Sequence, residues 1–289
     1  MKVLIIQSPN GEYLQDSIFL GFKDLFGTDV ESFRESQYLY QNHEFNRNTL
    51  WGMGFTYTNI LNPELSVVEK NPIEKIKDNY YDLIIYSNVS REMTFLDEVL
   101  KITGGKNVIM VNVEDMYHDF YNLNDKVLYF KRELYEKPSS NVHPIFYGIH
   151  SSKIYEGEVN KTQDISKSIP SLDYCTNISS SKIIFDNELD YYNDYRISNY
   201  GITMKKGGWD SMRHYEILAN KCIPLFKDID ECPELCLINL PKDLLSEINS
   251  RYPEINEREY VDYLNELHTY TKNNLTTKNV AEYILNFLQ

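Results

Sequence analysis

The stretch YGITMKKGGWDSMRHYEILANKCIPL, residues 200–225, decides the fold because strand and helix patterns alternate along it. Its two ends, Gly201–Lys205 and Cys222–Phe226, are short apolar runs typical of buried strands. Between them, Ser211–Asn220 has apolar residues at helical spacing and follows a loop with two glycines. Strand, glycine loop, helix and strand in this order predict part of a parallel α/β sheet.

The N-terminal half of the chain has the same rhythm. Apolar runs predict buried strands over 2–7, 82–87, 107–113 and 127–130. Helical spacing predicts helices over 15–26, 73–79, 95–103, 190–198, 261–273 and 278–288, and a further strand is expected over 182–185. We therefore expect an α/β protein built from two parallel sheets.

Two stretches near the middle of the chain are typical of linkers, namely Pro138–Asn141 and Tyr147–Ser152. They predict two domains of similar size, residues 1–147 and 148–289. One segment of the first domain, Phe33–Pro63, fits the alternation poorly because it is polar and aromatic. We interpret it as a lid or an insertion.

Composition and charge exclude several classes of protein. With 29 basic and 43 acidic residues, the net charge of −14 argues against coating nucleic acid or an anionic membrane through bulk charge. A chain that is 42% hydrophobic and 13% aromatic is not disordered. The N-terminal apolar run stops at Ile6, too short for a signal sequence or a membrane span, so a cytoplasmic protein is expected. The four cysteines show no metal-site spacing, and we expect reduced thiols and no metal.

The loop and helix after Gly201 carry the candidate binding site. A loop between a strand and a helix N-terminus binds ligands in open parallel sheets, and its N–H groups can hold a phosphate. Arg213 and Glu216 are three residues apart and share one helical face, so both can point at one ligand. An arginine suits a diphosphate, and a carboxylate suits the hydroxyl groups of a ribose. The candidate donor-binding residues are Lys205, Lys206, Gly207, Gly208, Trp209, Asp210, Arg213, His214 and Glu216.

Plainer interpretations of these residues stay open. Arg213 and Glu216 can instead form an ion pair on the helix surface, which contributes little. Trp209 stacks on a base or fills the core, and His214 is either a surface histidine or a base. Asp228-Ile229-Asp230 matches a common metal-binding pattern, and we interpret it as a loop.

Two acidic residues, Glu114 and Asp115, follow the predicted strand 107–113. Side chains at the carboxyl end of a parallel strand face the ligand crevice, so these are the candidate catalytic bases. Glu12 and Asp16 near the first strand are reserves. The chain has no G-x-G-x-x-G and no Walker loop, so nothing indicates nicotinamide binding or ATP hydrolysis.

Arg213, Glu216 and Ala219, followed by Ile223-Pro224, resemble the nucleotide-sugar motif of GT-B glycosyltransferases. The likeness is to the exostosin-like and CgeB-like transferases, with a family 1/4-type C-terminal domain. Val113-Glu114-Asp115 and the run 129–134 (YFKREL) are similar to elements of the same transferases' first domain. The resemblance implies two Rossmann-like domains with parallel sheets facing across a cleft. It implies a hexosyl- or pentosyltransferase that uses a nucleotide-diphosphate sugar and needs no metal or other cofactor.

The acceptor and the catalytic competence stay open. Related transferases carry two glutamates eight positions apart. In this chain Glu216 matches the second of them, but Gly208 stands at the position of the first. A non-catalytic nucleotide- or glycan-binding module of the same fold is therefore one alternative. A phage-type transferase acting on modified DNA is another. The acceptor is a glycan, a protein or a modified DNA base, and the net charge disfavours the last.

Overall fold

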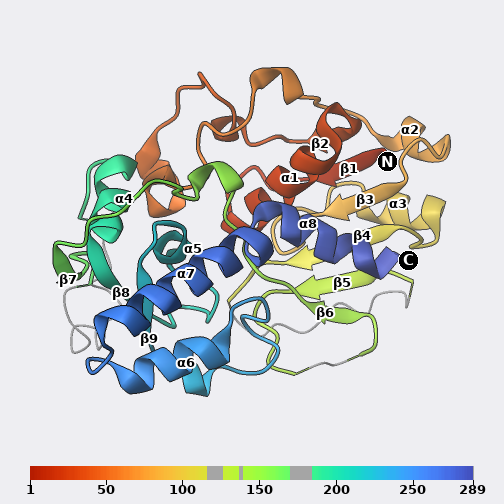
Figure 1. Cartoon of the computed structure of the whole chain (residues 1–289). Helices are drawn as coiled ribbons and strands as arrows, with labels where there is room; N and C mark the ends of the chain where they lie inside the picture. The colour runs from red at the N-terminus through yellow and green to blue at the C-terminus, as the bar shows by residue number, and fades with distance from the viewer. Residues whose placement is uncertain (116–125, 137–138, 170–183, 289) are drawn as a thin grey trace.

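The computed structural model describes residues 1–115, 126–136, 139–169 and 184–288, and it contains two parallel sheets (Figure 1). The first sheet has six strands in the order β2-β1-β3-β4-β5-β6. Its strands are β1 (Val3–Ile6), β2 (Val30–Phe33), β3 (Leu83–Tyr86), β4 (Val108–Asn112), β5 (Leu128–Lys131) and β6 (Val142–Pro144). The second sheet consists of β7 (Gln163–Ile165), β8 (Ser198–Met204) and β9 (Ile223–Lys227), in chain order.

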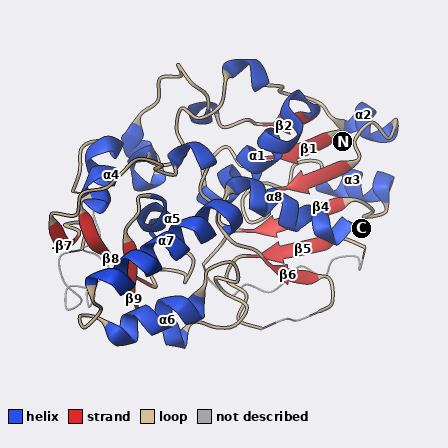
Figure 2. Ribbon diagram, viewed as in Figure 1, coloured by secondary structure: helices blue, strands red, loops and turns tan. Residues whose placement is uncertain are grey.

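The first sheet is buried on both faces, as its apolar strands require. In β1, Val3 and Ile5 belong to one core cluster and Leu4 and Ile6 to another, because successive side chains point to opposite faces. The helices on the first face are α1 (Tyr13–Phe26) and α8 (Thr277–Leu285), and those on the second are α2 (Ile73–Lys77) and α3 (Leu96–Thr103). Helices and strands form separate layers (Figure 2).

The larger core cluster continues into the second sheet, where it includes Ile202 of β8 and Leu225 of β9. Four helices surround this sheet, namely α4 (Glu188–Arg196), α5 (Met212–Ala219), α6 (Lys242–Arg251) and α7 (Glu257–Asn274). The predicted α/β class with parallel sheets is confirmed. Among the described residues, no helix is long and apolar enough to cross a membrane, and the expected location in the cytoplasm stays a prediction.

Several elements differ from the sequence predictions. Strands β2, β6 and β7 and helix α6 were not predicted. The strand expected over 182–185 begins outside the described residues, and Ile184 and Phe185 are not in a strand. The segment Phe33–Pro63 contains the short 3₁₀ helices η2 (Gln37–Leu39), η3 (Arg47–Thr49) and η4 (Trp51–Gly54).

The chain crosses between the two sheets twice, first after β6 and again between α7 and α8. The crossings are paired: Ile149 N–H donates to the Leu275 carbonyl at 2.8 Å, and Thr277 N–H donates to the Ile149 carbonyl at 3.0 Å. The second crossing brings α8 back against α1 of the first sheet (Figure 1). The predicted domain boundary after residue 147 stays a prediction, and a simple division there would separate α8 from the sheet it covers.

Close packing of α1 on α8 depends on Gly21. A Cβ atom at this position would collide with the Thr277 carbonyl and lie 3.1 Å from the Ala281 Cβ. In an exposed helix, Gly→Ala adds about 1 kcal/mol of stability. Here we expect Gly21→Ala to lower the free energy of unfolding by about 2 kcal/mol, because overpacking displaces the helix pair. Urea unfolding measures this, and an increase in stability would contradict the packing of α8 on α1.

Candidate functional site

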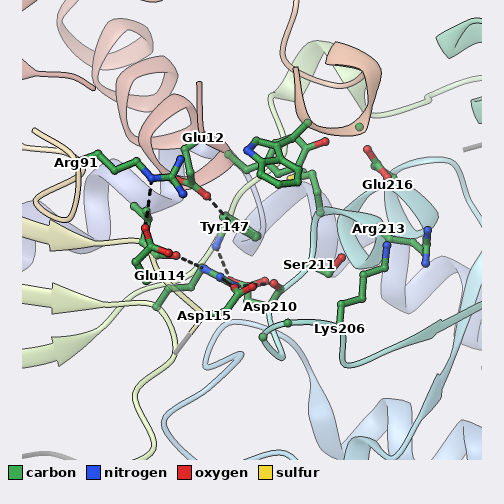
Figure 3. A pocket seen from close by; sticks show the side chains of 18 of the residues that line it. Glu12, Arg91, Glu114, Asp115, Tyr147, Lys206, Asp210, Ser211, Arg213 and Glu216 are labelled. Carbon is green, nitrogen blue, oxygen red and sulfur yellow. Dashed lines mark hydrogen bonds and ion pairs between the residues drawn. The ribbon is translucent and has the colours of Figure 1, made fainter. Parts of the chain in front are cut away.

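A cleft of about 460 Å³ lies at the carboxyl ends of strands from both sheets (Figure 3). On the side of the first sheet, its walls come from the segments after all six strands, β1 to β6. On the other side they come from the loop after β8 and from α5. The cleft volume suits a small-molecule ligand, and its place matches the crevice where parallel α/β sheets bind theirs.

The N-terminus of α5 opens into this cleft. Ser211 is the N-cap residue, but its side chain makes no capping hydrogen bond, and the first turn contains no acidic residue. Free N–H groups and the helix dipole favour an anion at such an end. Ser211, Met212 and Arg213 all line the cleft.

Arg213 is the most unusual side chain of the cleft. Only 7% of the residue is exposed, yet its Nε and Nη1 atoms have no hydrogen-bond partner among the described residues. Lys206 points into the same region from the loop after β8 (Figure 3). Burial and the neighbouring Arg213 charge lower the pKa of Lys206 to about 7. Two neighbouring cations with unused hydrogen-bond donors form a site for a doubly charged anion such as a diphosphate.

Glu216 lies in the same part of the cleft and is buried, so an ion pair on the helix surface is excluded. Its carboxylate accepts a hydrogen bond from Tyr191 Oη at 2.7 Å and a second from Thr56 Oγ1. Burial raises the pKa of Glu216, while these hydrogen bonds and the charge of Arg213 oppose that rise. The Thr56 contact joins the segment before β3 to the α5 side of the cleft.

The glycine loop has a second role besides lining the cleft. A Cβ atom on Gly207 would collide with the Asp115 carboxylate, and one on Gly208 would collide with that of Glu133. Both glycines therefore allow acidic side chains of the first sheet to approach closely. Asp210 continues this contact, because its carboxylate accepts from Tyr147 N–H at 2.8 Å and from Tyr215 Oη at 3.0 Å.

Burial raises the pKa of Asp210 to about 7. Arg132 of the first sheet donates to the Asp210 carbonyl at 2.6 Å and to Glu133 at 2.9 Å. Asp210 lines the cleft, but its hydrogen bonds are used to join the two sheets. These hydrogen bonds explain the position of Asp210 without any contact between its carboxylate and a bound ligand.

Three of the predicted donor-binding residues lie outside the cleft lining. His214 is buried between Thr203 Oγ1 and the Trp209 carbonyl, both at 2.8 Å, and burial lowers its pKa to about 3. Trp209 is in the core, 4% exposed. Lys205 is exposed, with its Nζ 5.2 Å from the centre of the Trp209 ring. These positions favour the core interpretation of Trp209 and His214.

Both candidate bases line the cleft after β4, and each is held by an arginine. Glu114 pairs with Arg91 Nε at 3.3 Å and accepts from Ser90 Oγ at 3.0 Å. Asp115 pairs with the buried Arg132, and its side chain is 44% exposed. Of the two, Asp115 is the one that touches the glycine loop.

The reserve residues lie deeper. Glu12 caps α1 by accepting from Leu14 N–H at 2.8 Å, and it lines the cleft. Asp16 lies behind it and accepts from Tyr38 Oη at 2.7 Å, outside the lining of the main cleft. Burial raises the pKa of both carboxyls, that of Asp16 well above its ordinary value.

Sequence reasoning missed part of the lining. The additional residues are Tyr13, Trp51, Gly52, Arg91, Val113, Tyr147, Tyr191, Ser211 and Met212. Arg132 also lines the cleft, and the sequence allows the run 131–133 to be either a charged surface turn or part of the cleft wall. Most of these residues lie directly after a strand or at the start of a helix, and such a position in the sequence could have indicated that they line the cleft. Trp51 and Tyr191 carry no such signal, because they reach the cleft from an irregular segment and from α4.

Among the residues that the structure describes, the cysteines and acidic residues outside the cleft give no sign of a further site. No group of three or more His, Cys, Asp or Glu side chains suited to a metal ion lies in the described part of the chain. Cys222, Cys232 and Cys236 are free thiols, and Cys175 lies outside the described residues. The two acids of Asp228-Ile229-Asp230 flank the start of a 3₁₀ helix after β9, away from the cleft lining.

Comparison with known proteins identifies the architecture. No protein-family model matches the chain, and no curated protein sequence matches it. Among solved structures, the Anabaena protein Alr3699/HepE, in complex with UDP and glucose, is similar with a TM-score of 0.53 and 8% identity, covering 100% of this chain and 99% of that one. An alpha-glucosyltransferase, in complex with UDP and a 13-mer DNA containing a central A:G mismatch, has a TM-score of 0.54 and 10% identity, with 99% of each chain covered. The chain thus has the GT-B type of fold, with two parallel α/β sheets facing across a cleft.

Proposed function

We propose that the protein transfers a sugar from a nucleotide-diphosphate sugar to an acceptor hydroxyl. The observation that carries this proposal is Arg213, a buried cation in the cleft whose Nε and Nη1 have no partner among the described residues. Leaving such donors unpaired is costly, so a site that keeps them is built for a bound anion. Both similar structures contain UDP, which supplies an anion of the required kind.

Each part of the cleft then has a role. Arg213, Lys206 and the N-terminus of α5 hold the diphosphate, and Glu216 accepts from the ribose hydroxyls. As the bond between the sugar and the diphosphate breaks, the two cations offset the negative charge that develops on the leaving group. Because these cations can do this alone, we propose that no metal is required.

On the other side of the cleft, we propose Asp115 as the base, with Glu114 as a neighbouring carboxylate that shapes the same wall. In a single displacement, Asp115 removes the proton of the acceptor hydroxyl as its oxygen attacks the anomeric carbon, and the nucleoside diphosphate leaves. The ion pair with Arg132 holds the Asp115 carboxylate in place next to the glycine loop. The remaining predicted residues act by positioning the loop that contains Gly207 and Gly208; they are Lys205, Trp209, Asp210 and His214.

Finer assignments follow the resemblance described above. We propose a member of the exostosin-like and CgeB-like group, acting in the cytoplasm as a hexosyl- or pentosyltransferase. The sugar in one similar structure is glucose, which favours a hexose donor. The domains we propose remain residues 1–147 for the acceptor and 148–289 for the donor.

Calorimetric titration of the full chain with UDP and GDP, followed by product analysis with UDP-glucose, tests the proposal. We expect one nucleoside diphosphate to bind at a single site and the sugar to be released or transferred. Binding without any turnover would instead support a non-catalytic nucleotide-binding module. If neither nucleotide binds, the proposed function is wrong.

The pKa of Lys206 predicts how donor binding depends on pH. In the free protein this pKa is about 7, and a bound diphosphate raises it, so binding takes up a proton above pH 7. We expect the dissociation constant for UDP to rise by up to about tenfold per pH unit above pH 7, the limit for loss of one proton. Calorimetry in buffers of different ionisation enthalpy measures both the affinity and the proton uptake.

The matched control is Lys206→Arg, because arginine stays charged throughout this range. At each pH, the dissociation constant of the wild type for UDP is divided by that of the variant. This ratio does not contain the effect of protonating UDP itself, because that effect is the same for both proteins. The ratio also cancels the titration of Asp210, whose pKa of about 7 acts in the same direction. An identical pH dependence in both proteins would show that Lys206 does not contact the diphosphate.

A further inference from the structure

The exposed indole of Trp51 is unexplained by donor binding. Trp51 is one of two tryptophans, and it lines the cleft although 65% of the residue is exposed. The other, Trp209, is 4% exposed and lies in the core. A large aromatic face left open at a cleft is a surface for stacking against a ligand ring, because its apolar area is buried only when the ligand is present.

The backbone around Trp51 is fixed in place rather than left free. Gly52, Met53 and Gly54 have φ angles of 57°, 57° and 69°, and for Met53 this left-handed conformation is strained. Phe55, which follows, is 1% exposed and stacks on Tyr191 with ring centroids 5.7 Å apart. A strained turn held by buried neighbours pre-organises the side chain that it presents.

Thr56 ties the same segment to the α5 side of the cleft. Its hydroxyl donates to Glu216 and lies 2.8 Å from Tyr192 Oη, and its N–H donates to Glu188 at 2.5 Å. The residue is completely buried. The segment that carries Trp51 is therefore held with respect to the Arg213 and Glu216 site.

The charges near the candidate bases indicate what stacks on Trp51. Trp51 and Glu12 line both the cleft and a smaller pocket next to it. Glu114 and Asp115 line the cleft too, where Arg91 is already paired with Glu114 and Arg132 with Asp115. Carboxylates accept hydrogen bonds from hydroxyl groups but repel phosphates. With a net charge of −14, a polyanion would be repelled by the protein as a whole too. A neutral sugar ring, which offers an apolar face and several hydroxyls, fits both features.

We propose that Trp51 is an acceptor-binding residue that stacks on a neutral sugar ring, and that the acceptor is a glycan or glycoside rather than nucleic acid. This inference rests on the proposed glycosyl transfer and names its acceptor class. Stacking on Trp51 places the ring beside Asp115 and Glu12, so that an acceptor hydroxyl faces the candidate base. Phenylalanine retains part of such a stacking surface and alanine removes it.

Intrinsic fluorescence tests the proposal because Trp51 is the only exposed tryptophan. The full chain is titrated, with and without UDP, with methyl glucosides, maltose, cellobiose, and single- and double-stranded DNA oligonucleotides. With excitation selective for tryptophan, we expect the neutral glycosides to change the emission of the wild type and not that of Trp51→Phe, in which Trp209 is the remaining tryptophan. By calorimetry, Trp51→Ala is expected to weaken glycoside binding about tenfold, which is about 1.4 kcal/mol, with Trp51→Phe in between.

The outcomes separate this inference from the proposed function. UDP affinity is expected to be unchanged in Trp51→Ala, since the residue is placed on the acceptor. If UDP binds but no glycoside of the panel changes the Trp51 emission, the inference is wrong and glycosyl transfer stands. A response to DNA alone overturns the sugar acceptor and favours a transferase acting on DNA. Failure of UDP binding overturns the proposed function, whatever the glycosides do.

Discussion

Replacing Arg213 with methionine is expected to weaken UDP binding about a hundredfold and, at the same time, to leave the stability of the unliganded protein nearly unchanged. A charged hydrogen-bond donor removed from a buried ionic contact costs about 2–5 kcal/mol of affinity, and a hundredfold is about 2.7 kcal/mol. In the free protein, the Nε and Nη1 atoms have no partner among the described residues, so methionine removes a desolvation cost. This gain offsets the lost attraction between Arg213 and the buried carboxylate of Glu216. Calorimetry and thermal unfolding measure the two effects.

The contrast between a large loss of UDP affinity and a small change in stability makes the prediction specific. A structural arginine would lower the unfolding temperature when replaced, whereas a ligand-binding arginine lowers only the ligand-induced rise. Arg213→Lys is the matched control, because it keeps one charge but loses the planar fork and is expected to bind UDP at an intermediate affinity. Unchanged UDP affinity in Arg213→Met would remove the donor site from this position.

Replacing Asp115 with asparagine is expected to lower the turnover number by about 10²–10⁴-fold, the usual contribution of a general base. The measurement is release of UDP from UDP-glucose in the presence of a glycoside acceptor. Affinity for UDP is expected to change less than twofold, which is under about 0.4 kcal/mol, because the proposed role concerns the acceptor proton. Asparagine keeps the shape next to Gly207 and the contact with Arg132, so the fold is preserved.

Two parallel variants show whether the right carboxylate was chosen. Glu114→Gln tests a residue of the same wall that Arg91 and Ser90 hold, and a smaller loss is expected. Glu12→Gln tests the deeper carboxylate and keeps an oxygen for capping α1. Full activity in Asp115→Asn together with a large loss in Glu12→Gln would move the base to Glu12.

The sequence predicted the elements whose residues are uniformly apolar or clearly periodic. Strands β1, β3 and β4 are such runs, because both faces of the first sheet are covered. Strand β2 has the sequence VESF and was missed, since nothing local shows that Glu31 is buried with Tyr81 Oη at 2.6 Å and Lys75 Nζ at 2.8 Å. Strand β7, with the sequence QDI, has one apolar residue and is too short and polar to be recognised.

The site was predictable where its residues are neighbours in the chain. Arg213 and Glu216 were found because one helix turn brings them together, and Lys206 because it precedes that helix. Local sequence could not show that His214 points into the core, as this depends on where β8 and β9 lie. Nor could it show that Thr56 donates to Glu216, because 160 residues separate the two. Long-range contacts of this kind are set by tertiary packing.

The paired crossings between the two sheets have a consequence for motion. Gly148 lies so close to Thr276 that a Cβ atom at this position would be 2.5 Å from the Thr276 carbonyl oxygen, and the adjacent backbones are hydrogen-bonded to each other. Two joined strands of chain resist twisting against one another far more than a single strand does. Any change in the angle between the two sheets therefore has to bend both connections together at this point.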